Sequence, residues 1–134
     1  MFLYNNRSGC IILCDKKKNK NIISLEKSSL VNVISQDGNK YVLNGGTIYK
    51  SKLKYSLHNG EYQLLNIPEN HPLTITDTNN MISYTGDEDK KLTMGDVSYY
   101  YGDITITVNG DFNTASIKCY YHGYMGGQDV LVYS

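Results

Sequence analysis

Short apolar runs of alternating character, separated by turn residues, recur along this chain and most constrain its fold. In the segment ITITVNG, Ile104, Ile106 and Val108 alternate with two threonines and are followed by an Asn-Gly pair. Successive side chains of a strand point to opposite faces, so this alternation predicts a strand with one buried face. No segment of helical length shows a helical period with caps. Many short strands at about ten-residue spacing predict an all-β sandwich.

The predicted strands cover most of the chain. They are residues 9–14, 21–25, 30–35, 40–43, 48–57, 61–67, 73–76, 103–108, 115–121 and 129–133. Asp-Gly and Asn-Gly pairs favour two-residue type I′ hairpins, since both central residues need positive φ. Such pairs occur at 37–38, 59–60 and 109–110, and the last is the clearest case. The region 77–101 is less regular, and the family resemblance described below implies a loop there that crosses between sheets.

Length and composition indicate one globular domain without a net charge that would attract oppositely charged partners. The chain has 134 residues, 40% of them hydrophobic and 19% charged, and its formal net charge is zero. Nothing in this balance favours nucleic acid, and no segment approaches the roughly 18 apolar residues of a membrane helix. The N-terminus does not resemble a secretory signal, because its apolar run is short and its basic cluster follows that run. These features predict synthesis and retention inside a cell.

The segment KCYYHGYMGG carries an unusual set of possible metal ligands. Cys119, His122 and Met125 form a C-x2-H-x2-M pattern, and His71 lies 48 residues upstream of Cys119. Two imidazoles and one thiolate in a trigonal plane, with a weak axial thioether, make a type-1 copper centre. We therefore expect the Cys119 sulfur and one nitrogen from each histidine to lie within about 4 Å of a common centre.

Each of these residues has a simpler interpretation when it is taken alone. A single cysteine in a strand is usually part of the core, and a histidine before proline usually lies in a turn. The order and spacing of the whole set favour the metal site. His58 is left outside it, because it belongs to the turn LHNGEY. No Ser-His-Asp set, phosphate-binding glycine loop or carboxylate pair is visible, and no open ligand position is evident, so the sequence does not predict an enzyme.

The segments GEYQLLNIPENHPLTI and SIKCYYHGYMGG resemble the cupredoxin family, in particular a subgroup of short domains in bacterial and viral proteins. The likeness covers residues 29–134. It implies a Greek-key β-sandwich in which one strand supplies a histidine and the loop between the last two strands supplies the other ligands. It also implies a mononuclear type-1-like copper site for one-electron transfer, formed by His71, Cys119, His122 and Met125.

The ligand loop is expected to be tight and shielded from water. Its glycines at 123, 126 and 127 permit close backbone paths, and its tyrosines at 120, 121 and 124 are expected to cover the metal. Pro72 departs from the family pattern. Cupredoxins usually have there a backbone N–H that points at the cysteine sulfur, and proline has none. One hydrogen bond to sulfur should therefore be missing, which alters redox tuning.

Residues 1–28 lie outside the likeness and are predicted to form a β-hairpin arm with a basic KKKNK turn. Cys10 and Cys14 in this arm are interpreted as small buried hydrophobes, because a strand would place them about 13 Å apart, too far for a disulfide. An isolated hairpin is marginal in water, so we expect the arm to make contacts within an assembly.

A second function remains open beside copper redox chemistry. In this alternative, the chain is a structural or interaction module of a large assembly, such as a minor capsid protein of a virus particle, with or without metal. The missing signal peptide, the arm and the abundance of residues with AT-rich codons favour this alternative. The expected partners are accordingly a redox partner or neighbouring proteins in an assembly.

Overall fold

The computed structural model describes residues 21–134 and confirms the all-β prediction. Strands connected by turns and loops make up this part of the chain, and no helix occurs in it. Among the same residues there is accordingly no apolar helix that could span a membrane. The predicted strand 9–14 and both cysteines of the arm lie outside the described residues.

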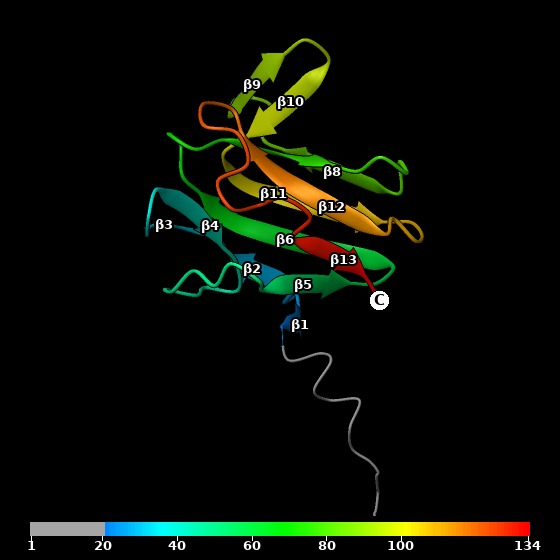
Figure 1. Ribbon diagram of the computed structural model, residues 1–134. Coiled ribbons are helices and arrows are strands. Elements are labelled where there is room, and N and C mark those ends of the chain that lie inside the picture. The colour runs from blue at the N-terminus through cyan, green and yellow to red at the C-terminus, as the bar shows by residue number, and fades with distance from the viewer. Residues whose placement is uncertain (1–20) are drawn as a thin grey trace, which may run out of the picture.

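The larger sheet contains both segments that carry the predicted ligands (Figure 1). In spatial order the sheet comprises β1 (Ile22–Ser24), β5 (Lys54–Leu57), β13 (Leu131–Tyr133), β12 (Thr114–Cys119), β7 (Leu73–Thr76), β10 (Val97–Tyr100) and β9 (Lys91–Met94). The strands β1 and β13 pair with β5 in parallel, whereas the other neighbours in this sheet are antiparallel.

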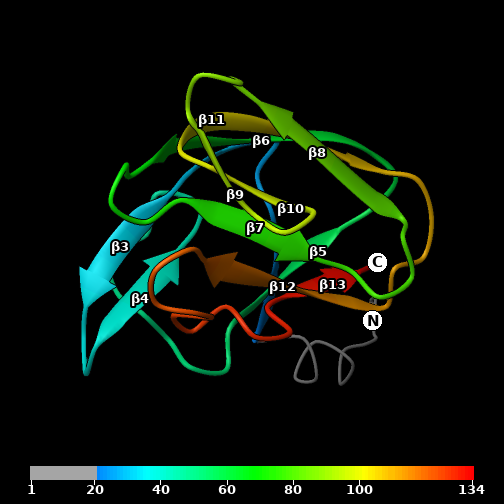
Figure 2. The same cartoon turned by 90° about the horizontal axis from the view of Figure 1, so that it is seen from above.

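A smaller sheet and a separate ribbon complete the architecture. In spatial order the smaller sheet comprises β2 (Ser28–Leu30), β6 (Gly60–Ile67), β11 (Gly102–Val108) and β8 (Ile82–Gly86). The ribbon consists of β3 (Asn32–Ser35) and β4 (Asn39–Val42). Figure 2 shows the orange segment that follows β12 running beside β4, in agreement with a hydrogen bond from the Tyr41 N–H to the Met125 carbonyl.

One hydrophobic core joins the two sheets. Ile104, Ile106 and Val108 of β11 are buried, as their alternation predicts, and they belong to the same cluster as Leu73 of β7 and Ile117 of β12. Each fully buried side chain of this size contributes about 1.5–3 kcal/mol relative to an exposed one. The arrangement is that expected of a β-sandwich.

The region 77–101 differs most from the sequence-based expectation. Instead of an irregular crossing loop it forms β8, β9 and β10, and the last two make a hairpin at the edge of the larger sheet. The predicted strand 48–57 is also shorter, because only Lys54–Leu57 is a strand. The predicted strand 30–35 is divided at Val31 between β2 and β3, which lie in different sheets.

Only one of the three Gly-containing turn pairs closes a hairpin. Asp37 and Gly38 both have positive φ, 56° and 95°, as this pair predicts, but Ser35 pairs with Asn39, so the loop that joins β3 to β4 has three residues rather than two. The other two pairs were predicted wrongly. Asn59-Gly60 and Asn109-Gly110 each connect a strand of one sheet to a strand of the other, so the strands that flank them do not pair.

The predicted N-terminal arm can be followed only from Asn21 onward. There β1 pairs in parallel with β5 of the larger sheet, and β2 pairs in parallel with β6 of the smaller one. Leu25 between them is buried in the common core. Residues 21–28 are therefore part of the sheets, and a boundary at residue 28 falls inside β2.

Candidate metal centre

The register between β7 and β12 brings together two residues that are far apart in the sequence. The two strands are antiparallel, with Ile117 opposite Ile75 and Cys119 opposite Leu73. Cys119 is thus the last residue of its strand, and His71 lies just before the first residue of the neighbouring strand. A hydrogen bond from the Tyr120 N–H to the Pro72 carbonyl, 2.9 Å long, continues the contact beyond the ladder.

The loop after Cys119 turns back on itself and returns His122 to the cysteine. Cys119 and Gly123 form an isolated bridge, in which the Gly123 N–H donates to the Cys119 carbonyl at 3.1 Å. Gly123 has a φ of 75°, a left-handed conformation that favours glycine. Further along, the Gly127 N–H donates to the Tyr124 carbonyl and the Ile117 N–H donates to the Gly127 carbonyl. The loop is therefore tied to itself and to β12.

Three possible ligand atoms converge at this point. The Cys119 sulfur lies 3.8 Å from the Nδ1 atom of His71 and 3.8 Å from the Nδ1 atom of His122. One ligand atom from each residue lies within 4.8 Å of the others. The predicted convergence is thus observed. Cys119 and His71 are buried, with 1% and 7% of their surfaces exposed, whereas His122 is exposed.

The separations fit a bound metal ion. An ion about 2.0 Å from imidazole nitrogen and about 2.3 Å from thiolate sulfur holds these atoms about 3.7 Å apart in a trigonal plane. Met125 lies close to the three residues and is buried, with a φ of 46°. The described residues thus bring the Cys119 sulfur and two imidazole nitrogens to one point, with Met125 close by. The identity of a metal does not follow from this geometry alone.

The electrostatics of the centre favour a neutral imidazole. Burial lowers the pKa of His71 below its ordinary value, and the neighbouring His122 lowers this pKa further. A histidine that has lost its proton leaves the Nδ1 lone pair free to bind a metal ion. His71, the most buried of the three histidines, is therefore held in the neutral form that a metal ligand needs.

Tyr41 of β4 also belongs to this centre, and the sequence analysis missed it. Its hydroxyl donates a hydrogen bond of 2.8 Å to the His71 carbonyl. Burial raises the pKa of Tyr41 far above its ordinary value, and the neighbouring Cys119 side chain raises it further. Nothing in the strand 40–43 marks a tyrosine with this role, because the residues that it contacts are distant in sequence.

The expected shielding by loop tyrosines is incomplete. Tyr120 packs edge-on against Tyr99, with ring centroids 5.3 Å apart, and Tyr121 packs against Tyr120 at 4.9 Å. Tyr121 and Tyr124 are nevertheless 59% and 40% exposed. Two of the three loop tyrosines, like His122, are therefore exposed to solvent.

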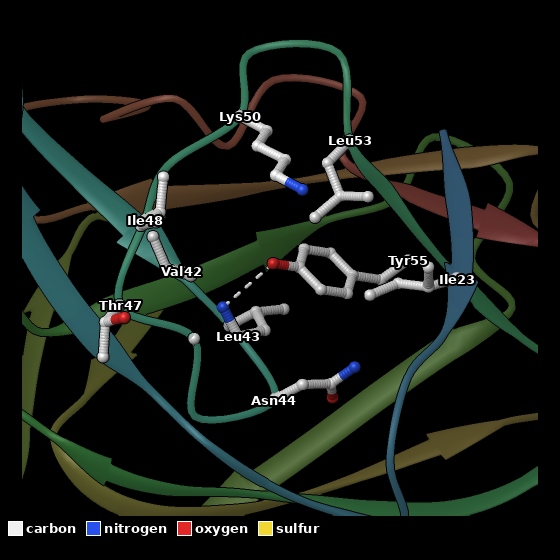
Figure 3. A pocket seen from close by; sticks show the side chains of 10 residues that line it. Ile23, Val42, Leu43, Asn44, Thr47, Ile48, Lys50, Leu53 and Tyr55 are labelled. Atoms are coloured by element: carbon white, nitrogen blue, oxygen red, sulfur yellow. Dashed lines mark hydrogen bonds between the residues drawn. The ribbon is translucent and has the colours of Figure 1, made fainter. Parts of the chain in front are cut away.

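Two other features lie away from the centre. His58, excluded on sequence grounds, instead contacts Tyr62, whose hydroxyl oxygen is 3.4 Å from its Nδ1 atom. A cavity of about 300 Å³ lies between β1, β4 and β5, and none of the four predicted ligands lines it. In Figure 3 the Tyr55 hydroxyl accepts a hydrogen bond from the Leu43 N–H at this cavity.

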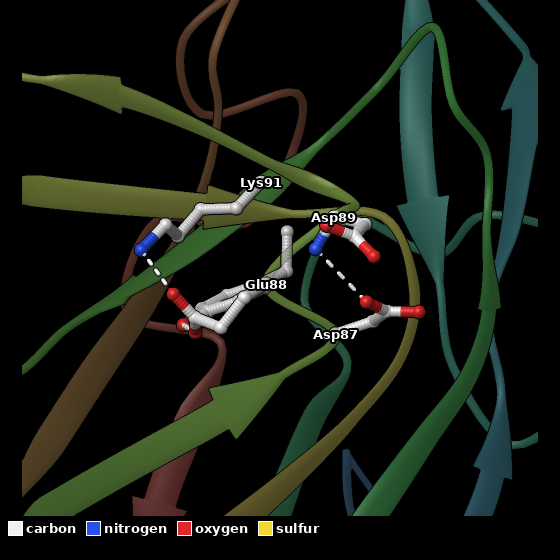
Figure 4. A network of polar contacts seen from close by, with 5 residues as sticks. Asp87, Glu88, Asp89 and Lys91 are labelled. Carbon is white, nitrogen blue, oxygen red and sulfur yellow. Dashed lines mark hydrogen bonds and ion pairs between the residues drawn. The ribbon is translucent and has the colours of Figure 1, made fainter.

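The acidic turn after β8 is internally paired. Figure 4 shows an Asp87 carboxylate oxygen accepting a hydrogen bond from the Asp89 N–H, and Glu88 pairing with Lys91. Glu88 also accepts a hydrogen bond from the Tyr100 hydroxyl, and these two partners lower the pKa of Glu88. In the described part of the chain, His71, Cys119 and His122 are the group whose ligand atoms converge for a metal, and this turn forms no such group.

Comparisons with protein-family models, with characterised proteins and with solved structures give no match to this chain. The interpretation of the centre therefore depends on its own geometry and chemistry.

Proposed function

We propose that this chain is a cupredoxin-like protein that binds one copper ion and carries one electron. The observation that carries the proposal is the approach of Cys119 Sγ to the Nδ1 atoms of both histidines at 3.8 Å. The nearby thioether of Met125 supports copper among possible metals, because soft thiolate and thioether ligands favour Cu(I) and imidazole suits copper in general. A Greek-key cupredoxin topology is part of this proposal, and the sandwich-like pair of sheets supports it.

Each ligand has a distinct role in the proposal. Cys119 supplies the anionic sulfur, His71 and His122 supply neutral nitrogens, and Met125 is the weak axial ligand. Bound copper supplies the chemistry, accepting one electron as Cu(II) and releasing it as Cu(I). Burial of Cys119 and His71 excludes water, whereas the exposed His122 is the ligand at which a redox partner protein gains closest approach.

Copper titration of the purified metal-free chain tests this proposal. We expect one equivalent of Cu(II) to produce an intense thiolate-to-copper charge-transfer band in the visible spectrum. Cys119→Ser should abolish the band, because it removes the sulfur that lies 3.8 Å from the Nδ1 atoms of both histidines. The double variant Cys10→Ser/Cys14→Ser is the matched control and should keep the band.

Two outcomes separate the alternatives. A band that survives in Cys119→Ser would show that the type-1 assignment is wrong. A folded wild-type chain that binds no copper would instead favour the scaffold function in a large assembly such as a virus particle, which so far depends on the sequence features alone. Synthesis and retention inside the cell is compatible with both functions and stays a prediction.

A further inference from the structure

The cavity between β1, β4 and β5 has a buried apolar floor and an exposed rim (Figure 3). Val42, Leu43 and Tyr55 line it and are buried, and they form the floor. Ile23 and Ile48 also line it, with 41% and 64% of their surfaces exposed, and they belong to the rim. The volume of about 300 Å³ is at the lower limit of the range in which proteins bind small molecules. The cavity is therefore large enough for a ligand with a small apolar body.

The Tyr55 hydroxyl at this floor has a donor that no described residue uses. Figure 3 shows the ring extending across the cavity toward Leu43, whose N–H donates to the hydroxyl oxygen at 3.1 Å. Within residues 21–134 the proton of this hydroxyl has no acceptor. A hydroxyl carries one O–H donor beside its acceptor lone pairs, and a buried donor without an acceptor is costly. The cavity thus offers a hydrogen-bond donor to a ligand.

The charge at the rim is positive. Lys50 is the only charged residue that lines the cavity, and Figure 3 shows its side chain pointing toward it from the loop between β4 and β5. In the described part of the chain no carboxylate pairs with its ammonium group. Lys52 and Lys54 follow in the sequence, and no acidic residue occurs between Lys40 and Glu61. The rim therefore attracts an anion.

We propose that this cavity binds a small monocarboxylate with a hydrocarbon chain. The chain packs against the floor and the isoleucines of the rim, where burial of apolar surface stabilises it. The carboxylate accepts the free hydrogen bond of Tyr55 and pairs with Lys50, whose ammonium is carried on a flexible stem. A second carboxylate would find no partner, because only one cation lines the cavity. None of the predicted copper ligands takes part, so this inference does not depend on the proposed function.

NMR titration of the metal-free full chain with octanoate tests the proposal. We expect octanoate to shift the methyl signals of Leu43, Ile48 and Leu53, with a dissociation constant on the order of 1 mM for a ligand of this size. The matched probes 1-octanol and octylamine have the same hydrocarbon chain but a neutral or a positive head group. They should bind about tenfold more weakly, since charge-assisted hydrogen bonds are the strong ones.

Two results of the titration would overturn the proposal. Shifts of equal size with all three probes would show an apolar surface, such as one that faces another protein, rather than a carboxylate site. Octanoate that leaves the three methyl signals unmoved would show that the cavity does not take this ligand.

Substitutions at the two anchors test the contacts separately. Lys50→Met should weaken octanoate binding about fivefold, as expected for a partly exposed ion pair. Tyr55→Phe should weaken it about tenfold, because the carboxylate loses its donor at the floor. Lys52→Met is the matched control, because Lys52 is exposed in the same loop and does not line the cavity, and it should leave the affinity unchanged.

The comparison of the two lysine variants is the decisive one. Lys50 and Lys52 are both exposed, so neither substitution disturbs the core, whereas Tyr55→Phe also removes the acceptor of the Leu43 N–H. An equal loss of affinity in the two lysine variants would overturn the proposal, because it would show a general effect of positive charge.

Discussion

Gly127 offers the most direct test of how the ligand loop is built. A Cβ at this position would lie 2.4 Å from the Ile117 carbonyl oxygen and 2.9 Å from the Tyr124 carbonyl oxygen. Both atoms are backbone, and both residues hydrogen-bond to Gly127 at 2.7–2.8 Å. For Gly127→Ala we expect about 1–3 kcal/mol of overpacking and about 1 kcal/mol from weakened hydrogen bonds. The free energy of unfolding should therefore fall by about 3 kcal/mol.

Gly123→Ala in the same loop provides the comparison. Its φ is 75°, but no atom lies within 4 Å of an added Cβ, so only the left-handed backbone is penalised. That penalty is about 1–2 kcal/mol. Urea unfolding of the metal-free variants should show midpoints that fall further for Gly127→Ala than for Gly123→Ala, with unchanged slopes. Equal midpoints would refute the argument that close backbone approach requires glycine at position 127.

Three further predictions concern stability. The metal-free chain should lose stability as pH falls below about 6.5, the unfolded pKa of histidine, because the pKa of folded His71 is lowered and the unfolded chain binds the extra proton. His71→Gln should reduce this pH dependence in urea unfolding, and an unchanged dependence would contradict the assignment. Phe112→Ala should cost about 3–5 kcal/mol, since Phe112 is fully buried against Tyr133; a loss below 1 kcal/mol by the same assay would contradict this packing. Gly38→Ala should destabilise the β3–β4 hairpin by about 1 kcal/mol, because φ is 95° there, and a neutral result in thermal unfolding would count against a left-handed backbone at Gly38.

Strands with a clean alternation could be predicted from the sequence, and those without it could not. Residues 103–108 alternate strictly and form most of β11, with every second side chain buried. In β9 and β10 burial does not alternate, because the adjacent residues Thr93 and Met94 are both exposed and the adjacent residues Tyr99 and Tyr100 are both buried. Their periodicity is therefore absent, and the turn at Gly95, with a φ of 62°, carries no Asn-Gly or Asp-Gly signal.

Turn chemistry predicted local conformation better than it predicted strand pairing. An Asn-Gly pair indicates that the chain bends, but the next strand can pair with its neighbour or cross to the other sheet. After β11 the chain crosses, because β6 and β8 already occupy both edges of that strand. β12 pairs instead with β7 and β13. The choice depends on long-range pairing that a short sequence window does not contain.

The residues of the candidate centre could likewise be predicted only in part from the sequence. Cys119, His122 and Met125 lie within one short loop, so their spacing alone suggested a common site. His71 was added from the chemistry of a type-1 ligand set and from the resemblance to cupredoxins, since no local spacing predicts an approach that depends on the β7–β12 register. Tyr41 could not be predicted at all. It is 30 residues from His71 and reaches the centre from a ribbon whose position no local pattern specifies.

The placement of these residues bears on what the centre is suited to do. The sulfur-to-nitrogen separations are 3.8 Å, close to the value of about 3.7 Å that a bound ion imposes. The strand ladder fixes Cys119 beside the His71 segment, the loop hydrogen bonds return His122, and Tyr41 holds the Met125 and His71 segments together. Binding of an ion would therefore need little movement of these atoms. A centre held in this way would also change little between two oxidation states, which supports the proposed one-electron transfer.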